Sequence, residues 1–151
     1  MEEKSGMSLI VKRITRITVS LIFLYGVYIM LHGHITPGGG FAGGVIIALS
    51  FIHLVLAFGK DFAFKRLTRE FISMLESLGG VMFLTIALLG FTGGFFFLNF
   101  LKHGKPFELF SSGTIILSNI AIFIKVGAGL FAIFIALAVL RISITGEREK
   151  Q

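Results

Sequence analysis

The chain contains no cysteine, only two prolines, and charged residues at only 15% of its 151 positions. Without cysteine it can form no disulfide and hold no cysteine-ligated metal or iron–sulfur centre, so any redox chemistry must belong to partner proteins. The scarcity of charge, together with 55% apolar residues and a mean hydropathy of +0.93, lies outside the range of soluble globular domains. The sequence therefore predicts an integral, multi-pass protein of the cell membrane.

Four apolar runs are long enough to cross a membrane as helices. A helix needs about 20 mainly apolar residues to cross a hydrocarbon layer of about 30 Å, so the length accommodates four spans and leaves no room for a separate catalytic domain. We expect one all-α transmembrane domain over residues 1–151, with spans at about 14–31, 41–58, 71–101 and 114–140. The third run is longer than one perpendicular span requires. That helix is either tilted or broken near Gly93 and Gly94, with the segment FFFLNFL along the membrane interface.

The basic residues predict the orientation of the chain. Four lie before or at the start of the first span, four in the second connector and three in the tail, whereas the first connector has none and the third has two. Basic residues collect on the cytoplasmic side, so we expect both termini in the cytoplasm. The net charge of +6 therefore comes from basic residues that orient the chain in the membrane. We expect no nucleic-acid partner.

The first connector, LHGHITPGGGFAGG, is rich in glycine and contains the first proline. Proline suits the first turn of a helix, so a helix is expected to begin near Pro37. Gly40, Gly44 and Ala48 then form a stripe of small residues that allows another helix to approach closely. Alternatively, the glycines expose backbone amides to an anion or water at the start of the helix.

The segment HGHITPGGGFAGGVIIA closely resembles the signature of the MrpB subunits of multisubunit Mrp-type sodium/proton antiporters. The four-span topology and the segment LSNIAIFIKVGAGL of the fourth span resemble that family as well. The resemblance implies a small, non-enzymatic membrane subunit, of a kind also found in archaeal membrane-bound hydrogenases and related respiratory complexes. It identifies eight motif positions: His34, Pro37, Gly38, Gly39, Gly40, Phe41, Gly43 and Gly44.

Three functional hypotheses follow. The first is an accessory subunit of a multisubunit sodium/proton antiporter, which helps to form an ion or proton path at interfaces with other membrane subunits. The second is a mainly structural subunit of a redox-driven complex such as a membrane-bound hydrogenase. The third is an enzyme that uses His32, His34 and His103 with a metal, but no carboxylates accompany these histidines, so we expect no metal site and no cofactor.

Three ionisable residues lie inside the predicted spans: His53, Glu76 and Lys125. Because a charge in hydrocarbon is costly unless it is paired or hydrated, these residues are the candidates for an ion path. The carboxylate and the ammonium group each share a helical face with small residues, which points them toward protein or water rather than lipid. The small residues are Gly80, Ala87 and Gly94 for Glu76, and Ser118, Ala121, Ala128, Ala132 and Ala136 for Lys125, whereas Phe123, Phe131 and Phe134 lie elsewhere on the fourth span.

Counting residues from the span ends predicts how deep these groups lie. His53 and Glu76 would each lie about 8 Å inside the cytoplasmic boundary, where they could meet. Lys125 would lie about 22 Å deep, which leaves an offset of about 14 Å from Glu76, to be filled by water or by the carboxylate of a partner. Lys125 and Glu76 are thus either static anchors to neighbouring subunits or members of a proton or sodium path. In both cases we expect an acidic or polar group within reach of Lys125.

Overall fold

The computed structural model describes residues 6–59, 68–101, 104 and 111–148, with side chains up to residue 140. Over these residues the chain is entirely helical apart from turns and loops, as the sequence predicts. The helices are α1 (Leu9–Leu31), α2 (Gly39–Phe58), α4 (Arg69–Leu89) with the short 3₁₀ helix η1 (Gly90–Gly93), and α5 (Thr114–Arg148).

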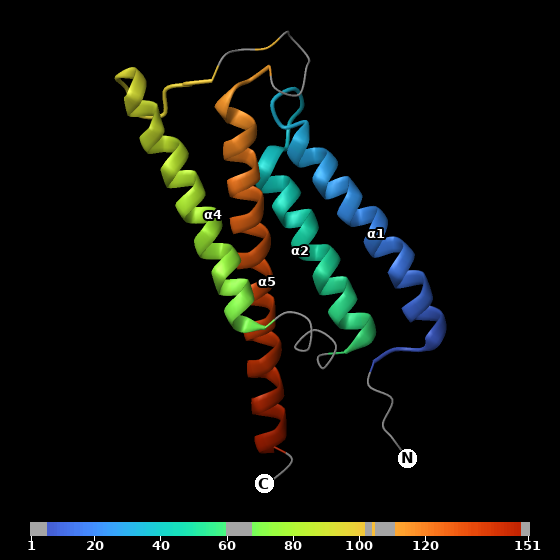
Figure 1. The fold of residues 1–151 in the computed structure, drawn as a ribbon. Coiled ribbons are helices and arrows are strands. Elements are labelled where there is room, and N and C mark those ends of the chain that lie inside the picture. The colour runs from blue at the N-terminus through green and yellow to red at the C-terminus, as the bar shows by residue number, and fades with distance from the viewer. Residues whose placement is uncertain (1–5, 60–67, 102–103, 105–110, 149–151) are drawn as a thin grey trace.

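The four long helices lie side by side, in the order α4, α5, α2, α1 (Figure 1). Helix α5 packs along α4 on one side and along α2 on the other, and α1 packs mainly against α2. Helix α1 begins and α5 ends at the same end of the molecule, which we call the Leu9 end (Figure 1). The turn of residues 32–38 marks the opposite end, the glycine-loop end.

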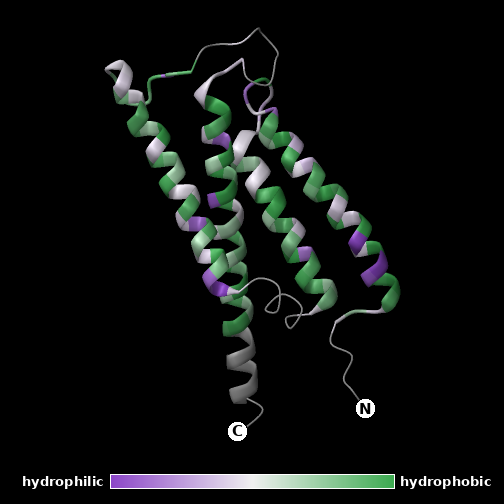
Figure 2. Cartoon of the chain, viewed as in Figure 1, coloured by the Kyte–Doolittle hydropathy of each residue, from purple (hydrophilic) through white to green (hydrophobic). Residues whose placement is uncertain are grey.

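All four helices are long and apolar enough to cross a membrane, and Figure 2 shows how apolar residues dominate them. Apolar side chains extend around the helices rather than along one stripe, so many large ones remain exposed. The buried core is correspondingly small. Its main cluster joins Val55 of α2, Ile72 of α4, and Phe131 and Ile135 of α5.

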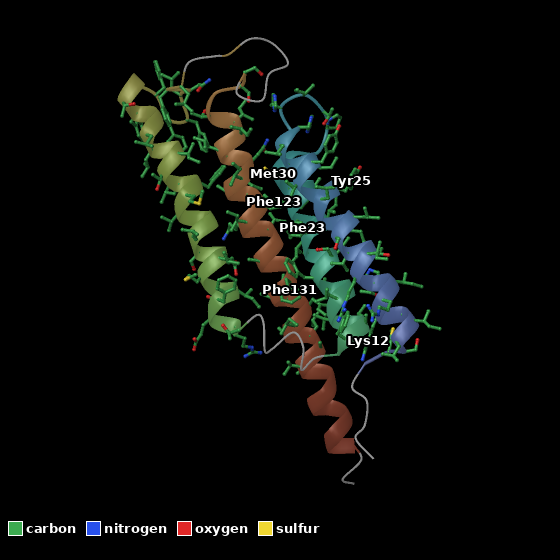
Figure 3. All side chains as sticks on the ribbon, turned by 45° about the vertical axis from the view of Figure 1, so that its right-hand side comes forward. Lys12, Phe23, Tyr25, Met30, Phe123 and Phe131 are labelled. Carbon is green, nitrogen blue, oxygen red and sulfur yellow. The ribbon has the colours of Figure 1, made fainter. Side chains whose placement is uncertain are left out.

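An aromatic series links three of the helices across this core. The ring centroid of Phe51 on α2 lies 6.4 Å from that of Phe23 on α1 and 5.8 Å from that of Phe131 on α5. Figure 3 labels Phe23 and Phe131. Phe131 is only 3% exposed, so protein contacts on the fourth span are not confined to the predicted face of small residues. Its position arises because α5 has neighbours on two sides.

Helices α1 and α4 begin earlier than the apolar runs suggest, and each has a side-chain cap at its start. The Ser8 hydroxyl accepts a hydrogen bond from the backbone N–H of Val11 at 3.4 Å, and the Thr68 hydroxyl accepts one from Phe71 at 3.3 Å. The basic first turns of α1 are therefore helical. Lys12 and Arg16 lie over the ring of Phe58, at 5.9 Å and 5.3 Å from its centroid.

The third predicted span is not one continuous helix. Helix α4 ends at Leu89, η1 follows, and Gly94 adopts a left-handed conformation with φ of 102°. The chain then folds back, and the backbone N–H of Phe97 donates to the carbonyl of Ala87 at 3.2 Å. Of the two alternatives, the structure therefore shows the break near Gly93 and Gly94, at the residues best able to reverse the chain.

Candidate functional site

The glycine-rich turn joins α1 to α2 through backbone conformations that suit glycine. Gly38 and Gly39 have φ values of 139° and 69°, which other residues rarely adopt. Helix α2 consequently begins at Gly39 rather than at Pro37. The backbone amides of Ile35 and Thr36 both donate to the carbonyl of His32 and so close the preceding turn.

The predicted stripe of small residues on α2 is confirmed as a close helix contact, and its partner is α5 of the same chain. A Cβ atom on Gly40 would overlap the carbonyl oxygen of Asn119, and one on Gly44 would lie 2.9 Å from the carbonyl oxygen of Phe123. Ala48 continues the stripe and is only 2% exposed. These positions admit no larger side chain without moving the helices apart.

Of the remaining motif residues, some pack against other helices and others are exposed. Gly43 faces α1, where its Cβ would lie 2.8 Å from the carbonyl oxygen of Gly26. His34 is half-buried in the turn, whereas Pro37 and Gly38 are exposed. The side chain of Phe41 is also exposed, at 64%, and so points away from the contacts that the glycines make.

Asn119 was not among the predicted site residues, yet it is the polar contact between α5 and the motif. Its Oδ1 accepts a hydrogen bond from the backbone N–H of Gly40 at 3.3 Å, one of the amides left without a helical partner at the start of α2. A Cβ atom on Gly39 would lie 3.1 Å from the same oxygen. An amide side chain in an apolar run is a signal that could have identified this residue.

Lys125 and Glu76 meet directly. The Nζ atom of Lys125 lies 3.8 Å from Oε1 of Glu76, and the two side chains are 52% and 43% exposed. The acidic group expected near Lys125 is therefore Glu76 of the same chain. The expected axial offset of about 14 Å between them is wrong, because α5 continues to Arg148 and extends beyond the start of α4 (Figure 1).

Gly79 is the residue that brings α4 and α5 close enough for this ion pair. Its Cβ would lie 2.7 Å from the backbone nitrogen of Lys125 and 2.8 Å from the carbonyl oxygen of Ala121, which is fully buried. The neighbouring Gly80 is less confined, with its Cβ 3.6 Å from Nζ of Lys125. The sequence predicted that Gly80 and Gly94 belong to the stripe of small residues on this helix. The closest contact with α5 is instead made by Gly79, one position earlier than Gly80. A Cβ atom on Gly94 would have no neighbour within 4 Å.

His53 pairs with α1 rather than with Glu76. Its Nε2 lies 3.4 Å from the hydroxyl of Thr15, which is 2% exposed. Helix α5 lies between α2 and α4, which keeps His53 away from the ion pair. The suggested contact between His53 and Glu76 is therefore not formed.

Among the described residues, no three histidine, aspartate or glutamate side chains come together as a metal site would require. His32 instead contacts Tyr28 in a tilted arrangement, with ring centroids 4.1 Å apart, and its Nδ1 lies 3.0 Å from the carbonyl oxygen of Tyr28. His103 lies outside the described residues.

Residues 10–132 match the profile of the family described as "Domain related to MnhB subunit of Na+/H+ antiporter". The chain belongs to this MnhB-related family. The matched segment includes the glycine-rich turn, the ion pair and Asn119.

Relatives in bacteria and archaea support the assignment to the MnhB-related family. The uncharacterized protein MJ1307 of Methanocaldococcus jannaschii is 39% identical over 117 residues, which cover 73% of this chain and 44% of that protein. The mnhB2 protein of Staphylococcus epidermidis, whose name assigns it to an antiporter, is 39% identical over 62 residues, or 41% of this chain and 44% of that protein. The chain thus spans less than half the length of these two relatives.

A solved structure shares the fold of this MnhB-related chain. It belongs to the membrane-bound sulfane sulfur reductase, described as an archaeal respiratory membrane complex. The TM-score is 0.74 and the sequence identity 31%, over 89% of this chain and 61% of that one. The fold therefore occurs in a respiratory assembly as well as in the family named for an antiporter subunit.

Proposed function

We propose that this chain is an accessory membrane subunit of an antiporter-type complex and that the ion pair of Lys125 and Glu76 forms part of a cation or proton path at its interface with larger subunits. Membership of the MnhB-related family and the similarity to a chain of a respiratory membrane complex support the first part. The proposed ions are sodium and protons. The basic residues around the spans support a cytoplasmic location for both termini.

The proposed ion path rests on one observation: the charged pair of Lys125 and Glu76 lies within apolar spans and remains half exposed. Glu76 lies seven residues into α4, about 10 Å along the helix from Arg69 and so within a hydrocarbon layer of about 30 Å. Charges exposed to hydrocarbon are costly. The open side of the pair therefore requires water or polar groups of another subunit.

Small residues around the pair leave room for such an occupant. Gly80 lies beside the ammonium group of Lys125, and a Cβ on Gly129 of α5 would lie 3.7 Å from Oε1 of Glu76. Neither glycine covers the charges. A hydrated cation or the polar side chain of a neighbouring subunit can therefore approach them from outside the chain.

A mainly structural role is the alternative, and the tight glycine contacts favour it. Gly44 and Gly79 hold α2 and α4 against opposite sides of α5 at distances that exclude larger side chains. In this alternative, the ion pair anchors the chain to a neighbour of a redox-driven complex and no ion passes it. In both cases the chain itself carries no catalytic step.

Two substitutions at Lys125 distinguish the alternatives in the complex purified from membranes. For the ion path, Lys125→Ala leaves the complex assembled but slows sodium-dependent proton movement in vesicles, and Lys125→Arg restores part of it by keeping the charge. For the structural anchor, Lys125→Ala reduces the amount of complex but not the activity per complex. Normal assembly with normal transport in Lys125→Ala would contradict both.

A further inference from the structure

Helix α1 presents a continuous apolar stripe away from the other helices. The stripe consists of large side chains spaced three or four residues apart, each between 48% and 72% exposed: Ile10, Ile14, Ile17, Leu21, Leu24 and Tyr28. The opposite side of the helix carries Thr15, Gly26 and Met30, which are buried. Figure 3 shows Tyr25 on the outer side of this helix.

The two ends of the stripe carry the residues that suit the two surfaces of a bilayer. At the Leu9 end, Arg13 is exposed and can complement lipid phosphate groups. At the glycine-loop end lie both tyrosines of the chain, with their rings stacked at 6.4 Å, followed by His32 against Tyr28. Arg13 and His32 are separated by about 28 Å along the helix, close to the hydrocarbon thickness of about 30 Å.

Between these ends, the hydroxyl groups on the outer part of α1 are already paired within the helix. The hydroxyl of Thr18 donates to the carbonyl of Ile14 at 3.1 Å, and that of Ser20 donates to the carbonyl of Arg16 at 2.9 Å. Helices that pack together in membranes use small residues at the contact, as Gly26 does on the inner side of α1. The stripe itself has only large side chains, which favours lipid over a protein helix as its occupant.

We propose that this stripe of α1 is the lipid boundary of the chain. Helix α1 then lies at the periphery of the assembly, away from the half-exposed ion pair of α4 and α5. A lipid-facing α1 is compatible with either role of the ion pair, since the stripe and the pair lie on different helices.

Because the chain has no cysteine of its own, single cysteines can carry spin labels on this stripe. The complex in vesicles is labelled at Leu21→Cys, and collision rates with oxygen and with a water-soluble nickel chelate are measured against the same complex without the new cysteine. Leu24→Cys, one turn further, is a second position in case the first variant fails to assemble. Val19→Cys, at a half-buried residue on the inner side of α1, is the control that faces protein.

A lipid boundary predicts that labels at Leu21 and Leu24 collide with oxygen several-fold more often than the label at Val19 and rarely with nickel, because oxygen concentrates in hydrocarbon while the chelate stays in water. Low accessibility to both reagents, as at Val19, would show that another protein covers the stripe. High accessibility to nickel would show an aqueous surface. Either of these two results would overturn the proposal.

Discussion

Asn119 and Gly40 are 79 positions apart in the chain, and the Oδ1 atom of Asn119 accepts a hydrogen bond from the backbone N–H of Gly40 at 3.3 Å. This bond joins the start of α2 to α5 where a Cβ atom on Gly40 would overlap the backbone of Asn119. It satisfies a helix-start amide that water cannot easily reach inside the contact.

Replacing Asn119 by Leu should destabilise the chain, since the Gly40 amide would lose its acceptor at a cost of about 1–3 kcal/mol. The measurement is the thermal unfolding temperature of the purified complex. Ser118→Ala is the matched control, because the neighbouring Ser118 hydroxyl only donates to the carbonyl of Thr114 in its own helix. Equal stability of the two variants would show that the bond to Gly40 contributes nothing.

Gly44→Leu should prevent assembly, because its side chain would enter a space already closed by the carbonyl oxygen of Phe123 at 2.9 Å. The amount of complex recovered from membranes measures this effect. Leu49→Phe adds bulk at a residue of the same helix that is 54% exposed, and it should assemble normally. Normal assembly and transport in Gly44→Leu would contradict the packing role of the motif.

Two adjacent glycines offer a sharper comparison on α4. Gly79→Ala places a Cβ 2.7 Å from the backbone nitrogen of Lys125 and should cost about 1–3 kcal/mol, the usual range for overpacking. Gly80→Ala places its Cβ 3.6 Å from Nζ, an ordinary contact, and should be tolerated. Unfolding temperatures of the two complexes test this difference. If Gly80→Ala were the more damaging change, the register of α4 on α5 would have to be different.

The four-helix fold and the close contact at the glycine motif could be predicted from the sequence because both follow from local patterns. Long apolar runs define spans, and Gly40, Gly44 and Ala48 recur at the period of one helical face. The sequence did not show that α5 is the helix facing this stripe, because a stripe of small residues specifies close approach without specifying a partner.

The contact between Lys125 and Glu76 could not be predicted, because it depends on how far two helices are offset along their axes. The apolar run of the fourth span ends at Leu140, but its helix continues to Arg148, so counting from Leu140 gave the wrong axial offset between Lys125 and Glu76. Asn119 was missed for a related reason. Its role depends on the start of α2 lying against α5, which is a tertiary contact.

The most direct test of the proposed function is the rate of sodium-driven proton movement in vesicles that contain the complex with Glu76→Gln. Glu70→Gln, at an exposed glutamate in the first turn of the same helix, is the control. If the ion pair belongs to an ion path, Glu76→Gln should lower the rate per assembled complex by roughly tenfold, equivalent to about 1.4 kcal/mol on the barrier, while Glu70→Gln leaves it unchanged. An unchanged rate in an assembled Glu76→Gln complex would contradict the account.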